Sequence, residues 1–313
     1  MVSNKGVTCG LVIVSAILLA VVLKAGGQSA KSRPAKPAYK QKEVVNRLSA
    51  PAAPVPDVAA AKSPVNAFES ASLQNVRLQS DLNWVFGGRS QRGWYIYLPL
   101  VCGTLGVGEE AGGSAFAQAL ARWQKDKGLE PHGILDNATW FRIISMWQSS
   151  RSKDRNYPSA DRLVTAPPSD FYDPSRPDEL RMVERETYEA YKRMVAAAAA
   201  DPTLGLSLTR EGALSPDEKY FKIISSYRSR EYQDELRKKS PNSGRAGLAV
   251  NSPHFTGRAL DIYVGGEPVS TKDQNRLLQT RTRAYRWLVK NAARFGFRPY
   301  FYEPWHWEYC PQN

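Results

Sequence analysis

The sequence predicts an α+β fold, in which a small, mainly antiparallel sheet with covering helices follows a small helical module. Apolar residues recur at helical spacing in three segments: 115–124, 178–200 and 275–297. Runs rich in β-branched and aromatic residues, typical of strands, occupy three others: 220–227, 259–263 and 298–309. A further helix is expected to begin within residues 228–233, so the order from residue 178 onward is helix, strand, helix, strands, helix, strand, which indicates an α+β domain. The 313 residues include 23% charged and 11% aromatic residues, which is a globular composition.

Positive charge is concentrated at the start of the chain. Residues 1–63 hold nine lysines and arginines and two acidic residues, so they carry +7 of the net charge of +13. A nucleic-acid-binding protein usually gathers basic residues on its folded domain. A basic tail instead suits attraction to an anionic cell-surface polymer or to a membrane. We therefore expect no nucleic-acid partner.

The first residues have the composition of an export signal. Val7 to Leu23 is apolar or small throughout, with Lys5 before it and Lys24 after it. About 17 residues is short for a membrane span and slightly long for a signal-peptide core. We assign residues 1–27 to a signal peptide or a membrane anchor, although the excess of positive charge after the run opposes simple outward topology. Residues 28–65, rich in Ala, Pro and Lys, are assigned to a disordered linker.

A small helical module is expected over residues 66–150. Phe116, Leu120 and Trp123 share one helical face, and Gly128 marks the end of that helix. A second helix begins after an N-cap at Asp136 or its neighbour Asn137. The proline-rich residues 151–178 are expected to form a linker to a C-terminal domain, residues 179–313.

Three cysteines do not provide a disulfide framework. Cys9 lies in the apolar N-terminal run. Cys102 and Cys310 would be able to pair in an oxidising compartment if they lie close together, which the sequence leaves open.

Two short runs carry the candidate chemistry. His254 and Asp261 stand seven residues apart with Gly257 between them, and a turn there followed by a strand could bring both side chains together. His306 completes a set of three ligands, the number that a catalytic zinc site takes from the protein. Glu303 lies three residues before His306, and positions three apart on a strand point to opposite faces. An irregular backbone at Pro304 is therefore required if Glu303 is to share the cavity.

These runs resemble the VanY-type D-alanyl-D-alanine carboxypeptidases and related zinc peptidases. The matching motifs, in order, are Tyr227-Arg228-Ser229 with Gln233, then Ser252-Pro253-His254 through Gly257, Ala259 and Asp261, then Glu303-Pro304-Trp305-His306. The resemblance implies that one zinc ion is bound by His254, Asp261 and His306. It implies that Glu303 is the general base and acid, and that Arg228 stabilises the oxyanion. Gln233 and Ser252 would line the substrate pocket. Pro253 and Arg258 depart from the family pattern.

The helical module resembles the three-helix peptidoglycan-binding module of many wall hydrolases. The resemblance rests on Ala119 to Gln124 and on Gly128 to Trp140, and it covers residues 113–145. His132 replaces the usual Asp before Gly, and we interpret it as a turn residue.

Together the two resemblances imply an exported zinc D,D-carboxypeptidase that trims peptidoglycan stem peptides in the periplasm or cell envelope. Inner-membrane anchoring through residues 1–27 stays open. Two alternatives also stay open: an endopeptidase that cuts an internal stem or cross-bridge bond, and a wall-binding protein without catalytic activity.

Overall fold

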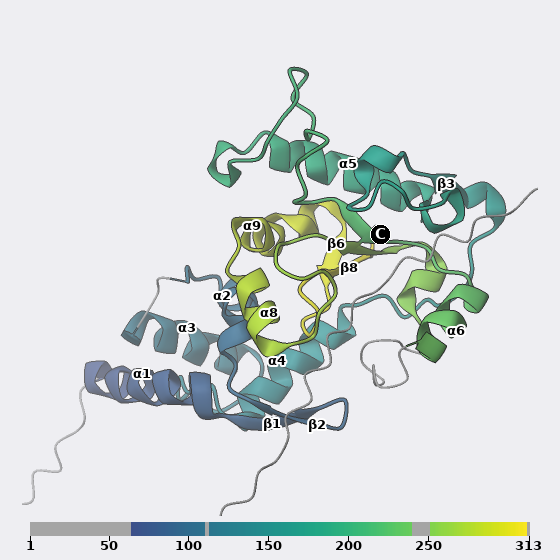
Figure 1. Cartoon of the computed structure of the whole chain (residues 1–313). Helices are drawn as coiled ribbons and strands as arrows, with labels where there is room; N and C mark the ends of the chain where they lie inside the picture. The colour runs from purple at the N-terminus through teal and green to yellow at the C-terminus, as the bar shows by residue number, and fades with distance from the viewer. Residues whose placement is uncertain (1–63, 110–112, 240–250, 312–313) are drawn as a thin grey trace, which may run out of the picture. The chain divides into compact units, whose positions relative to one another are not determined.

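The computed structural model describes residues 64–109, 113–239 and 251–311 (Figure 1). The expected signal or anchor, and the expected linker as far as residue 63, lie outside these residues. Pro64 and Val65 begin the first described helix. In the described part of the chain, no helix combines the length and the apolar character needed to cross a membrane.

The first half of the described chain is mainly helical. Its elements are α1 (Pro64–Asp81), β1 (Asn83–Phe86), β2 (Arg89–Arg92), α2 (Leu98–Leu105), α3 (Gly113–Asp126) and α4 (Asn137–Ser149). Gly128 follows α3 with a φ of 70°, and the Asp136 side chain caps α4 by accepting a hydrogen bond from the Thr139 N–H at 2.9 Å. The predicted helix stop and restart are therefore confirmed. The β1–β2 hairpin, the two-stranded sheet between α1 and α2, was not predicted.

The second half contains the predicted antiparallel sheet. Four strands lie in the order β5 (Ile223–Ser225), β6 (Ala259–Ile262), β8 (His306–Tyr309) and β7 (Phe297–Pro299), and every neighbouring pair is antiparallel. A second, two-stranded sheet joins β3 (Leu163–Thr165) to β4 (Met182–Glu184). The fold is thus α+β, as the sequence predicts.

Two predicted helices have different bounds. Helix α5 (Arg185–Ala199) begins seven residues later than the expected Asp178, because Met182 to Glu184 pair as β4 and the Glu184 carboxylate accepts the Thr187 N–H at the helix start. The expected helix over 275–297 is broken into α8 (Asp273–Thr280) and α9 (Arg283–Asn291). The Thr282 side chain caps α9 by accepting a hydrogen bond from the Tyr285 N–H. This cap marks the start of a new helix and so accounts for the break between α8 and α9.

Short elements complete the architecture. Helix α6 (Arg230–Lys239) follows β5. Seven 3-10 turns are described: η1 (Tyr95–Tyr97), η2 (Ala160–Arg162), η3 (Pro168–Asp170), η4 (Asp178–Leu180), η5 (Pro202–Leu204), η6 (Pro253–Thr256) and η7 (Ala292–Phe295). Cys102 and Cys310, both within the described residues, are not joined by a disulfide.

An aromatic cluster joins the helical half to the sheet. Phe301, which is 1% exposed, follows β7 and packs its ring against Phe86, Tyr97 and Trp147 at centroid distances of 4.8, 5.5 and 5.7 Å. Aromatic pairs at such distances add to the stability gained from burial. The described residues of both halves accordingly belong to one compact unit. The turn that holds Phe301 is fixed in part by side chains from a distant part of the sequence, before residue 150.

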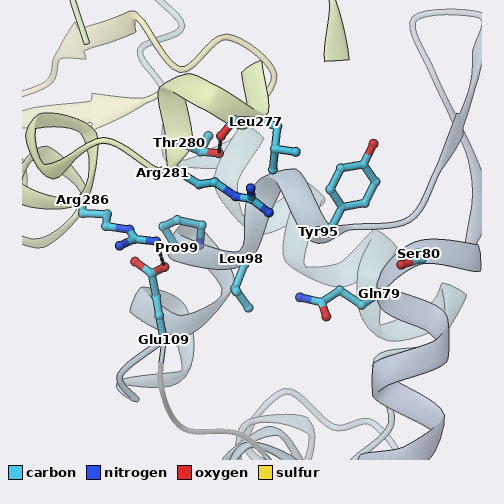
Figure 2. A pocket seen from close by; sticks show the side chains of 10 residues that line it. All are labelled: Gln79, Ser80, Tyr95, Leu98, Pro99, Glu109, Leu277, Thr280, Arg281 and Arg286. Atoms are coloured by element: carbon cyan, nitrogen blue, oxygen red, sulfur yellow. Dashed lines mark hydrogen bonds and ion pairs between the residues drawn. The ribbon is translucent and has the colours of Figure 1, made fainter. Parts of the chain in front are cut away.

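The same junction also contains a polar hollow. A cavity of about 320 Å³ lies between the first helices and α8 and α9 (Figure 2). Arg286 of α9 reaches Glu109 there at 2.9 Å. Its walls are formed by Gln79, Ser80, Tyr95, Leu98, Pro99, Glu109, Leu277, Thr280, Arg281 and Arg286. The junction thus combines an aromatic core around Phe301 with a polar opening beside α8.

Gly257 makes the turn that precedes β6. Its φ is 67°, in the left-handed region. Its carbonyl accepts the Glu184 N–H at 3.1 Å, and a Cβ at this position would lie 2.9 Å from that nitrogen. Two independent constraints, the backbone angle and the close approach, therefore require glycine. The predicted turn between His254 and Asp261 is confirmed.

Gly257→Ala should lower the free energy of unfolding by about 3 kcal/mol, from left-handed strain plus overpacking. Urea denaturation at pH 7 measures this loss. The matched control is Gly128→Ala: its φ of 70° is similar, but a Cβ there meets nothing within 4 Å. It should cost about 1 kcal/mol from strain alone. Equal losses for the two variants would contradict the close-approach argument.

Candidate metal and catalytic site

Three side chains from three separate segments converge on one point. His254 lies in η6, Asp261 in β6 and His306 in β8, where it pairs directly with Asp261 in the sheet register. The Asp261 Oδ1 atom is 3.3 Å from His254 Nε2 and 2.9 Å from His306 Nδ1. One ligand atom of each residue lies within 4.8 Å of the others, and all three residues are buried. The expected ligands are therefore brought together.

Each of the three residues has its other polar atom held by the protein. His254 Nδ1 lies 2.7 Å from the Ser226 carbonyl, which can only accept, so the proton belongs to Nδ1 and the Nε2 lone pair points inward. His306 Nε2 lies 3.3 Å from Glu308 Oε1, so its Nδ1 is the inward atom. Asp261 Oδ2 accepts a hydrogen bond from Arg228 Nη2 at 2.7 Å, so Oδ1 is the carboxylate oxygen that faces the two histidines. Two nitrogens and one oxygen are a donor set that fits a catalytic zinc ion with three protein ligands.

The charges of the cluster favour a bound cation. Burial, followed by Arg228, lowers the pKa of His254 to about 4. Burial would raise the pKa of Asp261, but His254, His306 and Arg228 hold it well below its usual value. Burial also opposes the charged form of His306, yet hydrogen bonds to Asp261 and Glu308 raise its pKa to about 9. The cluster thus keeps the negative charge of Asp261 and an extra proton on His306. A divalent cation would be attracted by the charge and would displace the proton.

Glu303 lies in the irregular turn between β7 and β8. Its N–H donates to the Tyr300 carbonyl at 3.1 Å, and its own carbonyl accepts the His306 N–H at 2.9 Å. The irregular backbone expected around Pro304 is present, because residues 300–305 belong to neither strand. Burial raises the pKa of the Glu303 carboxyl, the nearby His306 lowers it and Asp261 raises it, and together these effects bring it to about 7. Both protonation states are populated near neutral pH, as general acid–base work requires.

Arg228 and Gln233 lie behind the Asp261 carboxylate. The Arg228 guanidinium donates to Asp261, to Ser225 Oγ at 2.9 Å and to Gln233 Oε1 at 3.3 Å. Gln233, in α6, is 1% exposed. Both residues thus help to hold the Asp261 carboxylate in place. The oxyanion role of Arg228 and the substrate role of Gln233 stay predictions.

Ser252 supports the backbone that carries His254. Its Oγ accepts the His254 N–H at 3.3 Å and caps η6. The residue is 3% exposed. Its role in the substrate pocket likewise stays a prediction. His132, expected to be a turn residue, accepts the Ile134 N–H through Nδ1 at 3.0 Å, which confirms that interpretation.

Sequence reasoning missed two residues of the site, Ser226 and Glu308. Glu308 stands two positions after His306 on β8, so both side chains point to the same face of the sheet. Burial opposes the charge of Glu308, but hydrogen bonds to His306 and Arg151 lower its pKa to about 2. The two-residue spacing was the available signal. Ser226 acts through its backbone carbonyl, for which side-chain identity gives no signal.

Comparison with known proteins supports the motif-based prediction for the C-terminal part of the chain. Residues 180–312 match the family model of VanY, D-alanyl-D-alanine carboxypeptidase. A search of curated proteins gives no match. The family match does not extend to the helical half, so its resemblance to peptidoglycan-binding modules stays a prediction. His254, Asp261, Glu303 and His306 all fall within the matched residues. Residues 180–312 of this chain are a domain of the VanY family.

Proposed function

We propose that this chain is a zinc-dependent D,D-carboxypeptidase that hydrolyses the terminal D-alanine of peptidoglycan stem peptides in the cell envelope. A VanY domain indicates a peptidase of the D-alanyl-D-alanine carboxypeptidase type. The observation that carries the zinc assignment is the convergence of three inward-facing donor atoms, from His254, Asp261 and His306, in one buried cluster. Peptidoglycan is then the substrate partner. Anchoring to a membrane depends on residues outside the described part of the chain.

The metal ligands fix the position of the reaction. Zinc held by these three residues would polarise the scissile carbonyl and lower the pKa of a water molecule. Burial of all three side chains supports this role, because charges act more strongly where water is excluded. The outer atoms are held by the Ser226 carbonyl, the Glu308 carboxylate and the Arg228 guanidinium. These groups keep the ligands oriented before a metal binds, which reduces the cost of ordering the site.

Glu303 is the proposed proton carrier. Its carboxylate would take a proton from the attacking water and give it to the leaving amine. The pKa of about 7 supports both halves of this task near neutral pH. Arg228 is proposed to stabilise the oxyanion of the tetrahedral intermediate. Its hydrogen bond to Asp261 supports an additional role in orienting that ligand.

A direct assay separates this proposal from its alternatives. The zinc-loaded full chain is incubated with a stem pentapeptide ending in D-alanyl-D-alanine and, separately, with intact peptidoglycan sacculi. Release of free D-alanine is the expected result, and chelation should abolish it until zinc is returned. Soluble muropeptides without free D-alanine would instead indicate an endopeptidase. Neither product, with sacculi still bound by the protein, would leave only a wall-binding role.

Glu303→Gln should retain zinc while kcat falls by about 10³-fold, because the carboxylate moves the proton but is not a metal ligand. Zinc content and pentapeptide hydrolysis are measured on the same preparation. Glu267→Gln is the control, since that carboxylate is exposed and pairs only loosely with Lys272 at 3.4 Å. Wild-type turnover by Glu303→Gln would remove Glu303 from the mechanism.

Zinc affinity should rise with pH between pH 7 and 9. His306, with a pKa of about 9, holds an extra proton below that pH, and the inward Nδ1 must lose it to bind metal. His254, with a pKa of about 4, is already neutral and adds no dependence in this range. One proton released per ion predicts about a tenfold gain per pH unit, flattening above pH 9. Competition with a chromophoric chelator measures it, and a flat profile from pH 7 to 9 would contradict the assignment.

A further inference from the structure

We propose that Glu308 is a positioning residue for the metal ligand His306, and that Arg151, from outside the VanY-matched residues, holds Glu308 in place. The proposal rests on the proposed function in one respect, that His306 binds a metal ion. The proposal adds to the site a residue of the segment that follows α4, residues 151–178, which the sequence composition assigns to a linker.

The Glu308 carboxylate is placed to fix the His306 ring. Both residues lie on β8 two positions apart, and Glu308 Oε1 is 3.3 Å from His306 Nε2. Glu308 is 1% exposed. A carboxylate that accepts from the outer nitrogen of a metal-binding histidine sets its tautomer, orients the ring and makes it a stronger ligand. Glu308 can do all three for the inward Nδ1.

A carboxylate buried to this degree needs a cation, and Arg151 supplies it. Arg151 Nε donates to Glu308 Oε1 at 3.0 Å, and its Nη2 donates to the same oxygen. The backbone N–H of Ser152 donates to Glu308 Oε2 at 3.1 Å. Two consecutive residues therefore bind both oxygens of the carboxylate. Removing the cation would leave a buried negative charge uncompensated.

The Arg151 side chain is itself held on two sides. Its guanidinium carbon lies 4.0 Å from the centroid of the Tyr300 ring, and Nη1 donates to Gln148 Oε1 at 3.3 Å. Tyr300 in turn packs against the His306 ring, with centroids 5.9 Å apart. Arg151 follows directly after α4 and its C-cap Ser150. Arg151 thus reaches His306 indirectly by two routes, through the Glu308 carboxylate and through the Tyr300 ring.

A purely structural ion pair between α4 and the sheet is the competing interpretation. It predicts that loss of either residue changes stability without changing the affinity of the folded protein for zinc. If Arg151 instead acts on His306 through Glu308, loss of either residue weakens zinc binding by the folded protein. Once Glu308 has lost its charge, Arg151 has nothing further to contribute to zinc binding, so the two substitutions will not add.

The test measures zinc affinity of the full chain by chelator competition, with far-UV circular dichroism to verify folding. Glu308→Gln should weaken zinc binding about 10–100-fold, and Arg151→Ala about tenfold. The double variant should lie within about twofold of Glu308→Gln. Lys192→Ala is the matched control: it removes a cation 3.0 Å from another buried carboxylate, Asp170, and should leave zinc affinity unchanged.

Wild-type affinity in Glu308→Gln would overturn the proposal, as would an Arg151→Ala loss that persists in full in the Glu308→Gln background. If Glu308→Gln fails to fold, Arg151→Ala decides alone, and an unchanged affinity refutes the proposal. The measurement uses no substrate. A wild-type chain that binds zinc but releases no D-alanine would therefore refute the proposed reaction and leave this test intact.

Discussion

The buried carboxylate of Asp261 is the constraint on which the site depends. A charge taken out of water must be repaid by partners with good geometry. Arg228 donates a hydrogen bond to Oδ2, and the two histidines approach Oδ1. Each of those partners is then fixed by a further contact, His254 by the Ser226 carbonyl and His306 by Glu308. The result is a shell of protein groups on the outer side of His254, Asp261 and His306, with one donor atom of each residue turned toward the other two.

The aromatic junction explains why the turn that carries Glu303 keeps its shape. Residues 300–305 connect two short strands and belong to neither of them. Phe301 in that turn is buried among rings contributed by the helical half, and Tyr300 lies beneath the Arg151 guanidinium. Glu303 follows two residues later. A site on a loop gains precision when the loop is packed from behind, and here the packing comes from outside the family-matched residues.

The sequence predicted the parts of the site that are written in short motifs. His254, Gly257 and Asp261 lie within eight residues, and Glu303 precedes His306 by three, so local spacing was sufficient. Glu308 and Arg151 were missed because their interaction joins residues 157 positions apart, which no local pattern records. The start of α5 was predicted too early, and the break before α9 was missed. Amphipathic spacing detects a buried face but does not detect the side-chain caps at Glu184 and Thr282. The α+β class was correct because it depends only on the order of elements.

The separations between contacting residues also determine when the site can form during folding. Ser226 meets His254 across 28 positions, Asp261 meets His306 across 45, and Arg151 meets Glu308 across 157. Each of these contacts requires closure of a longer loop than the contact before it. The chain loses the conformational entropy of closing the loop before it gains the contact. A collapsed but incompletely folded chain therefore lacks the complete donor set. On the proposed function, tight metal uptake would mark the last stage of folding, so a partly folded chain would be unable to hydrolyse its substrate.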